Sequence, residues 1–314
     1  DKTPFYGEKG GQVGDTGRLG SDILNAEVLD TQIPVDGLSS HRVKVFDGAL
    51  VQDSTIHCSV SKMRRANICR NHTATHLLHH VLGDILGEHV KQAGSYVGPD
   101  RLRFDFTHFA AMSDEEIHQV DEKVNWLIAE SHEVQTYIKS LDEARREGVI
   151  ALFGEKYGDE VRVLDIEGVS KELCAGTHVK NTADINIFKV VAESSVGSNI
   201  RRIEAVTSME ALGFLESAYT ALVDISRKTK TTIFEASERV SNILEENKDL
   251  KKQVKAAKKA ADSSGIGSQI DKMLSSAIDT KGGFKLLVGS IGKGGVGDLR
   301  NAWDILRKKA GDNC

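Results

Sequence analysis

The sequence predicts an α+β fold with a strand-rich start, a mixed centre and a helical end. Residues 5–60 are rich in glycine and then alternate between polar and apolar positions, which is typical of short strands. From Asn71 apolar residues recur at spacings of three and four, as they do on the buried face of a helix. Alternating segments return between residues 102 and 206, so the central part combines helices with strands.

These patterns divide the chain of 314 residues into four predicted parts. Residues 1–60 form a small β unit, which we expect to be barrel-like. Residues 61–207 form an α+β domain, which is large enough to bury a core of its own. Residues 208–262 form a helical segment, and residues 263–314 form the truncated start of an α/β domain.

The central domain has a clear helix start. Ser113 is followed by three acidic residues, which is typical of an N-cap and the first turn of a helix, so a helix is predicted from there to about Glu133. Alternating patterns predict strands at 102–106, 161–166, 185–193 and 202–206.

The helical segment carries a heptad pattern. Its apolar and small residues, with one asparagine among them, recur at alternating spacings of three and four: Ile233, Ala236, Val240, Ile243, Asn247, Leu250, Val254, Ala257 and Ala261. This pattern predicts either a dimerising coiled coil or one arm of a helical hairpin within the chain.

Beyond the heptads the sequence predicts only a few elements. Serine and glycine residues at 263–268 indicate a hinge, residues 284–288 a strand, and residues 299–310 a helix. This is too little for an independent core.

The composition excludes several classes of protein. No run approaches 18 apolar residues, so a membrane span is excluded, and no secretory signal is visible at the start. The four cysteines show no regular spacing, which argues against a disulfide framework and favours a reducing compartment, the cytoplasm.

The net charge of -5 argues against a protein that coats DNA nonspecifically, but charge is unevenly distributed. Residues 1–207 hold 23 Lys and Arg against 32 Asp and Glu, whereas residues 208–314 hold 18 against 14. An acidic body with a mildly basic tail is compatible with an RNA partner that touches the tail and a few local patches.

Histidines and one cysteine form the most informative pattern. His72 and His76 stand at positions i and i+4 of the predicted helix, so both imidazoles project from one face. About 100 residues later comes a Cys-x-x-x-His element made of Cys174 and His178, with small residues between them. Three nitrogens and a thiolate are a ligand set that suits Zn²⁺, so the sequence predicts a metal site.

Several runs of this sequence closely resemble the editing half of the alanyl-tRNA synthetase family, in the family's order. They are Phe5-Tyr-Gly-Glu-Lys-Gly-Gly-Gln-Val-Gly-Asp-Thr-Gly17, Arg70-Asn-His-Thr-Ala-Thr-His-Leu-Leu78, Gln92-Ala-Gly-Ser-Tyr-Val97, Leu102-Arg-Phe-Asp-Phe106, Glu172-Leu-Cys-Ala-Gly-Thr-His178 and Ile200-Arg-Arg-Ile-Glu-Ala-Val206. The family usually has glycine where this chain has Ala175. That change is harmless unless the position needs a positive φ.

The resemblance implies an editing hydrolase that clears seryl and glycyl esters from tRNA(Ala). It implies a zinc ion held by His72, His76, Cys174 and His178, and the acceptor end of tRNA(Ala) as partner. Nothing in the sequence resembles the ATP-binding aminoacylation domain, so ATP and Mg²⁺ belong to a missing domain of an ATP-dependent ligase. We therefore expect no tRNA charging by this chain, and a homodimer through its helical and C-terminal region is possible.

The expected reaction is attack of water on an aminoacyl ester. Zinc would lower the pKa of a bound water or hold the amino group of the substrate. A catalytic site needs one open position, so we expect three protein ligands at a time, with His72 or His76 acting as a base when it is not bound to metal.

Selectivity for serine requires a polar partner for the substrate hydroxyl. Gln92 is the first candidate and Thr16 the second, the alternatives being a solvated side chain and a simple turn residue. For Asp105 and Glu172 we expect an ordinary surface ion pair each; the alternative is a carboxylate that orients a ligand imidazole.

Five arginines are candidates for phosphate contacts that bring the acceptor end to the zinc: Arg64, Arg65, Arg70, Arg201 and Arg202. The alternative is that they are solvated surface charges. Two other functions stay open, a free-standing editing protein and a non-catalytic, zinc-stabilised module that binds tRNA or dimerises.

Overall fold

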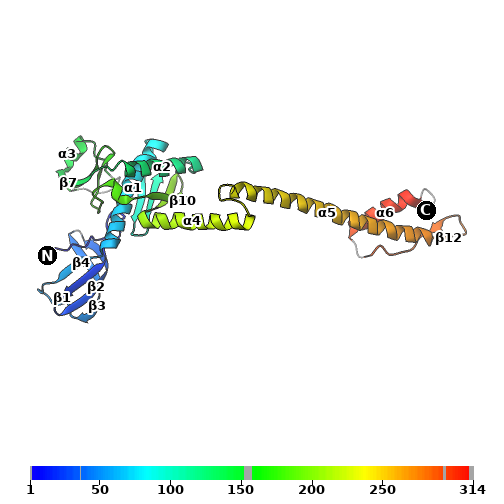
Figure 1. Ribbon diagram of the computed structural model, residues 1–314, viewed down its shortest axis with the longest axis horizontal. Coiled ribbons are helices and arrows are strands. Elements are labelled where there is room, and N and C mark those ends of the chain that lie inside the picture. Colours follow the sequence, from blue (N-terminus) through cyan, green and yellow to red (C-terminus); the bar gives the residue numbers. More distant parts are fainter. Residues whose placement is uncertain (1, 36, 152–157, 293–294, 311–314) are drawn as a thin grey trace. The chain divides into compact units, whose positions relative to one another are not determined.

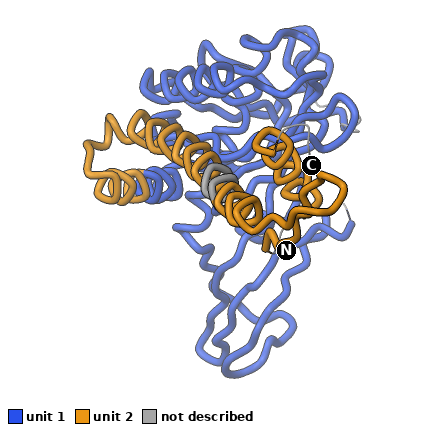
Figure 2. Tube along the Cα trace, turned by 90° about the vertical axis from the view of Figure 1, so that its right-hand side faces the viewer, with its two compact units in different colours: residues 1–218 blue, residues 219–314 orange. Residues whose placement is uncertain are grey.

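The computed structural model describes residues 2–35, 37–151, 158–292 and 295–310. The chain forms two compact units, Asp1–Ala218 and Tyr219–Cys314 (Figures 1 and 2). Helices and several small sheets make up the first unit, so the prediction of an α+β fold is confirmed. The division into four parts stays a prediction.

The first sheet lies in the N-terminal part and contains four antiparallel strands in the order β3-β2-β1-β4. The strands are β1 (Gly17–Ser21), β2 (Leu24–Val35), β3 (Leu38–Gly48) and β4 (His57–Val60). Leu24, Ala26 and Val28 alternate along β2 and form a small core with Phe5 and Leu19. The strands expected in residues 5–60 are therefore present, while closure into a barrel stays a prediction.

The second sheet has the strand order β10-β11-β6-β5 and packs against two helices. Its strands are β5 (Gln92–Val97), β6 (Leu102–Thr107), β10 (Phe188–Gly197) and β11 (Ile200–Thr207), and the helices are α1 (Lys62–Leu86) and α2 (Asp114–Ala129). The predicted N-cap is confirmed, because Ser113 Oγ accepts a hydrogen bond from the Glu116 amide, and the Glu116 carboxylate accepts one from the Ser113 amide. Apolar residues of α1, α2 and the sheet share one core, which holds α1 in place.

The third sheet has three antiparallel strands in the order β7-β8-β9. They are β7 (Val134–Ser140), β8 (Glu160–Ile166) and β9 (Ser170–Leu173), accompanied by α3 (Leu141–Arg146) and a short 3₁₀ helix (Thr182–Ile185). Strand β9 contacts α1 and ends directly before Cys174, so the sheet delivers the Cys-x-x-x-His element to the helix that carries His72 and His76.

The C-terminal part consists of α4 (Ser208–Thr229), α5 (Ala236–Ser275), β12 (Ile278–Asp279), β13 (Lys285–Leu286) and α6 (Val296–Ala310). The hinge predicted at 263–268 is wrong, because α5 continues through it. Ile266 and Ile270 are buried against Ala302 of α6, and this packing favours the helix although it contains two glycines, each of which costs about 1 kcal/mol. The strand predicted at 284–288 is reduced to the two residues of β13.

Two apolar heptad residues in the middle of α5 are open to solvent within one chain. Leu250 is 58% exposed and Val254 is 53% exposed. The coiled coil stays a prediction, and these two side chains are free to pack against a second helix. In the described ranges we find no helix that combines the length and the apolar character needed to span a membrane.

Candidate metal centre

Two segments far apart in the sequence bring His72, His76, Cys174 and His178 together. Their ligand atoms all lie within 4.8 Å of one another. His72 and His76 project from one face of α1 with stacked rings, whose centroids are 5.3 Å apart. The loop that follows β9 supplies the other two. In the described part of the chain this cluster has the side-chain types and the proximity that a metal ion requires.

The loop from Cys174 to His178 approaches α1 closely because of one glycine. A Cβ atom on Gly176 would lie 2.0 Å from Cε1 of His72, so no larger residue fits there without a shift. Ala175 is not among the described non-glycine residues with a positive φ, so alanine is accommodated at this position. Arg162 donates hydrogen bonds to the carbonyl oxygens of Cys174 (2.9 Å) and Gly176 (2.6 Å), which fixes the bend.

The donor atoms of the cluster face one another. Cys174 Sγ lies 3.4 Å from His72 Nε2 and 3.2 Å from His178 Nε2. His76 Nε2 is buried and makes no hydrogen bond in the described structure. A buried nitrogen without a partner is costly, and a metal ion at the centre of the cluster would satisfy it.

The electrostatics favour the forms of Cys174 and His178 that bind metal. Burial raises the pKa of the Cys174 thiol, but the neighbouring histidines His72 and His76 outweigh burial and hold that pKa well below its usual value. Burial, followed by the charge of His72, lowers the pKa of His178 to about 3. A thiolate and a neutral imidazole are the ligating species.

Glu172 stands behind His76. Its Oε2 lies 2.9 Å from His76 Nδ1 and 3.5 Å from His79 Nδ1, and the carboxylate is buried. Burial raises the pKa of Glu172, but the charge of His76 outweighs it and the pKa lies below the usual value. Burial lowers the pKa of His76, but Glu172 and Cys174 outweigh it and raise that pKa to about 10. The same negative charges favour a metal cation in place of the His76 proton. The expectation of a surface ion pair for Glu172 is therefore wrong, because the carboxylate is buried against His76.

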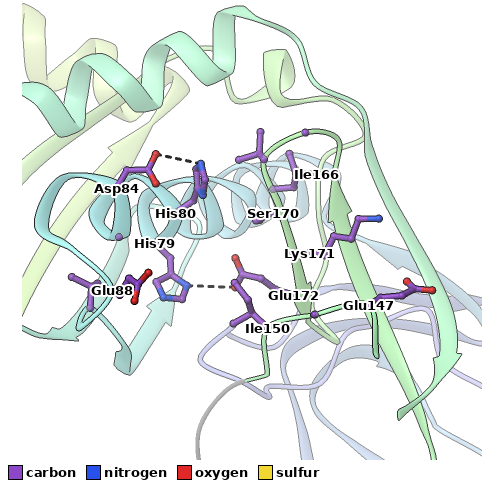
Figure 3. Close-up of a pocket in the computed structure, with 15 residues that line it drawn as sticks. His79, His80, Asp84, Glu88, Glu147, Ile150, Ile166, Ser170, Lys171 and Glu172 are labelled. Atoms are coloured by element: carbon purple, nitrogen blue, oxygen red, sulfur yellow. Dashed lines mark ion pairs between the residues drawn. The ribbon is translucent and has the colours of Figure 1, made fainter. Parts of the chain in front are cut away.

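Glu172 also lines a cavity of about 530 Å³ next to the cluster (Figure 3). His79 and His80 of α1, Asp84, Glu147 and Lys171 are among its other walls. Figure 3 shows His79 directed at Glu172 and His80 at Asp84. The cavity is thus separated from His76 by one carboxylate.

The structure places Gln92 and Thr16 outside the cluster. Gln92 begins β5, donates a hydrogen bond to Ser95 Oγ (3.3 Å), and lines a second cavity of about 310 Å³ together with His79. Thr16 lies just before β1, where its carbonyl oxygen accepts a hydrogen bond from the Ser61 amide (2.9 Å). Within the described residues, no hydrogen bond joins either side chain to the four clustered residues.

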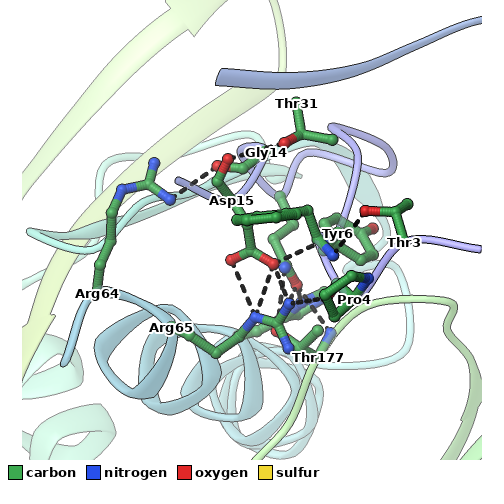
Figure 4. A network of polar contacts seen from close by, with 12 residues as sticks. Thr3, Pro4, Tyr6, Gly14, Asp15, Thr31, Arg64, Arg65 and Thr177 are labelled. Atoms are coloured by element: carbon green, nitrogen blue, oxygen red, sulfur yellow. Dashed lines mark hydrogen bonds and ion pairs between the residues drawn. The ribbon is translucent and has the colours of Figure 1, made fainter. Parts of the chain in front are cut away.

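The five arginines predicted to contact phosphates all make contacts within the chain. Arg65 pairs with the buried Asp15, and Arg64 donates to the Gly14 carbonyl oxygen (Figure 4). The other three contacts are those of Arg70 with the Asp184 carbonyl oxygen (2.9 Å), Arg201 with Glu193 (2.5 Å) and Arg202 with Asp105 (2.7 Å). Asp105 is therefore occupied by an arginine. These contacts hold the arginines in fixed positions, and their role towards RNA stays a prediction.

Sequence reasoning missed two residues that touch the cluster. Gln12 Oε1 lies 2.7 Å from His72 Nδ1, and Thr73 Oγ1 lies 3.3 Å from His178 Nδ1. Thr73 sits one residue after His72 on α1, which was a usable signal. Gln12 lies in the glycine-rich run, 60 residues from its partner, and spacing alone could not reveal the contact.

Comparison with known protein families shows which class of protein this chain is similar to. Residues 161–204 match the family model described as the Threonyl and Alanyl tRNA synthetase second additional domain, and residues 1–64 match the model of class II (A) tRNA synthetases. The first match includes Cys174 and His178, so the loop that completes the cluster lies in a segment that is similar to this domain.

The particular relatives are alanine–tRNA ligases. The chain is 42% identical over 311 residues to that of Desulforudis audaxviator and 43% identical over 311 residues to that of Pelotomaculum thermopropionicum; each alignment covers 99% of this chain and 35% of the relative. It is 48% identical over 253 residues to that of Thermotoga maritima, which is 81% of this chain and 29% of the relative. The resemblance to alanyl-tRNA synthetase is thus confirmed along nearly the whole chain, which spans about a third of the length of these relatives.

Proposed function

We propose that this chain is the part of an alanyl-tRNA synthetase that edits mischarged tRNA(Ala), by hydrolysing the aminoacyl ester of Ser-tRNA(Ala) and Gly-tRNA(Ala). One observation carries the proposal: four side chains of the types that bind metal have their ligand atoms within 4.8 Å of one another, in a chain similar to alanine–tRNA ligases. The charging of tRNA with ATP and Mg²⁺ is assigned to other parts of such a ligase.

The residues present fit a zinc ion. The three histidines and Cys174 offer the nitrogen and sulfur donors that zinc prefers, and His76 Nε2 is a buried atom in need of a partner. When bound, zinc supplies Lewis-acid character and lowers the pKa of a coordinated water.

The protein side chains then have separate tasks. His72, His76, Cys174 and His178 would hold the ion, with three of them bound at a time. His72, when not bound to metal, would act as a base towards the attacking water, whereas His76, whose pKa is raised to about 10, would be protonated and would act as an acid towards the leaving oxygen of the ester. Gln92 lines the smaller cavity beside His79, which supports a role in binding the serine hydroxyl. Thr16 is a second candidate for that role.

The acceptor end of tRNA(Ala) is the proposed macromolecular partner. Arg64, Arg65, Arg70, Arg201 and Arg202 are its candidate phosphate contacts. A guanidinium has five donors, so an arginine that makes one or two contacts within the chain retains donors for a phosphate oxygen. We place the protein in the cytoplasm, as expected from its cysteines.

Selective deacylation tests the proposal. Preformed Ser-tRNA(Ala), Gly-tRNA(Ala) and Ala-tRNA(Ala) are incubated with the chain, and the remaining ester is followed over time. We expect rapid loss of serine and glycine with alanine retained, and loss of activity after chelation that returns with added Zn²⁺. Equal hydrolysis of all three esters, or full activity in the chelator, would contradict the proposal.

A second candidate is a non-catalytic module that binds tRNA. It is favoured by the presence of four protein ligands, because a closed four-ligand site is typical of structural zinc. In that case the chain retards tRNA(Ala) in a gel-shift assay and retains its zinc, but hydrolyses none of the esters.

A further inference from the structure

The glycine-rich run before β1 is attached to the edge of β5. The Val97 amide donates to the Gly11 carbonyl oxygen (2.8 Å), and the Val13 amide donates to the Val97 carbonyl oxygen (3.1 Å). Gly11 has a φ of +82°, and a Cβ there would lie 2.7 Å from the Ser95 carbonyl oxygen. Gln12, between these two anchors, has 0% of its surface exposed and is held in one place.

The side-chain amide of Gln12 is fully engaged. Its Oε1 accepts a hydrogen bond from the Thr177 amide (2.9 Å) and lies 2.7 Å from His72 Nδ1, while its Nε2 donates to Thr177 Oγ1 (3.0 Å). A backbone amide can only donate, so the atom that faces it is the oxygen of Gln12. His72 Nδ1 must then carry the proton and donate it to that oxygen.

This hydrogen bond decides which nitrogen of His72 faces the cluster. With Nδ1 protonated, Nε2 of the neutral ring keeps its lone pair, and Nε2 is the atom 3.4 Å from Cys174 Sγ. His76 shows the same arrangement, with Nδ1 against Glu172 and Nε2 towards the cluster. Both imidazoles of α1 are therefore set to bind metal through Nε2.

Gln12 differs from the other partners in its origin. Glu172 lies two residues before Cys174, and Thr73 lies on α1 itself, whereas Gln12 comes from the N-terminal β unit. Through Thr177, the same amide also holds the loop between Cys174 and His178. One side chain thus connects three segments: the glycine-rich run, the helix and the loop.

We propose that Gln12 is a positioning residue of the metal centre, which fixes the tautomer of His72 and the loop that carries Cys174 and His178. The inference rests on the proposed function, because it concerns the same site. It makes the N-terminal β unit part of the metal centre. Outer partners of this kind change metal affinity by about 10- to 100-fold when they are removed.

Two near-isosteric variants separate hydrogen bonding from packing. Gln12→Met keeps the length of the side chain and removes the acceptor, whereas Gln12→Glu keeps an acceptor for both His72 and Thr177. Gln32→Met, at an exposed glutamine of β2, is the matched control. Zn²⁺ affinity is measured by competition with a chromophoric chelator, and the visible spectrum of the Co²⁺-loaded protein reports on the geometry of the ligands.

We expect Gln12→Met to bind Zn²⁺ about 10- to 100-fold more weakly with an altered Co²⁺ spectrum, and Gln12→Glu and Gln32→Met to stay within a few-fold of the wild type. Unchanged affinity and spectrum in Gln12→Met, or equal weakening in both Gln12 variants, would overturn the inference.

If Gln12→Met fails to fold, ¹⁵N NMR spectra of the wild type test the inference instead. A His72 ring without a proton on Nδ1 would contradict the proposed role of Gln12. A wild type that binds no Zn²⁺ would instead refute the metal centre itself.

Discussion

Glu172 is a buried carboxylate, with 3% of its surface exposed. Such a charge is stable only when it is paired, and His76 and His79 provide the pairing. Its position behind a candidate ligand is that of the carboxylates that orient metal-binding histidines and raise their basicity. We therefore expect the negative charge of Glu172 to be what supports His76 as a metal ligand.

The variant Glu172→Gln tests that charge. The amide oxygen of glutamine can still accept the hydrogen bond from His76, so only the charge is removed. We expect Zn²⁺ affinity to fall by about 10-fold or more in a chelator competition. Glu147→Gln, at an exposed carboxylate of the same cavity, is the control and should leave affinity unchanged. Equal affinity in both variants would show that the charge of Glu172 is unimportant.

The variant Gly176→Ala tests the close approach of the loop from Cys174 to His178 to α1. Gly176→Ala places a methyl group 2.0 Å from a ring atom of His72, so either the loop or the ring must move. We expect loss of most bound zinc, measured as metal content after dialysis, in a chain that is still folded by circular dichroism. Gly197→Ala meets no atom within 4 Å and should retain its zinc. Full zinc content in Gly176→Ala would contradict the described loop geometry.

At the scale of elements, an ion pair between the buried Asp15 and the partly exposed Arg65 attaches the N-terminal run to α1. Asp15 is 1% exposed and accepts hydrogen bonds from Arg65 of α1 and from the Tyr6 amide (2.7 Å), as Figure 4 shows. Removing one partner of a buried pair leaves the other without compensation, which is more costly than the pair itself is stabilising.

We therefore expect Asp15→Asn to lower the free energy of unfolding by about 2 kcal/mol, less than for a fully buried pair because water reaches Arg65. Denaturant titration measures this, with Asp47→Asn on the exposed part of β3 as the control. Because the run that holds Asp15 also holds Gln12, the variant should lose zinc at lower denaturant concentrations than the wild type. A change below about 0.5 kcal/mol would show that the pair does not fasten the run.

At the scale of the whole molecule, the apolar heptad residues of α5 are a candidate surface for pairing between two chains. Leu250 and Val254 are exposed at heptad positions, and pairing with a second copy would bury them. We expect the wild type to sediment as a dimer and the double variant Leu250→Glu, Val254→Glu to sediment as a monomer, because the pairing would bury charges. Lys255→Glu, next to these heptad residues, should remain dimeric. A monomeric wild type at micromolar concentration would contradict the dimer.

Patterns in the sequence correctly predicted the elements that are stabilised by contacts between residues close together in the chain. The cap at Ser113 and the helix with His72 and His76 depend on neighbours within four residues, and both are present. The supposed hinge at 263–268 failed because Ile266 and Ile270 pack on α6, a contact that composition does not reveal. Gln12 was missed for the same reason: its hydrogen bonds to Thr177 span 165 residues.

The candidate site likewise includes residues that short spacings in the sequence could reveal and contacts that they could not. The i, i+4 histidines and the Cys-x-x-x-His spacing led to the four residues that the structure brings together. The intramolecular partners of the five arginines lie up to 114 residues away, so the sequence could not show that these side chains are already engaged.

The most direct test of the central claim measures zinc and ester hydrolysis in the same samples of wild type, Cys174→Ala and Cys58→Ala. Cys58 is exposed on β4 and serves as the matched cysteine control. We predict one zinc per chain and hydrolysis of Ser-tRNA(Ala) in the wild type and in Cys58→Ala, and loss of both in Cys174→Ala. Hydrolysis by a zinc-free Cys174→Ala at the rate of the wild type would contradict the account.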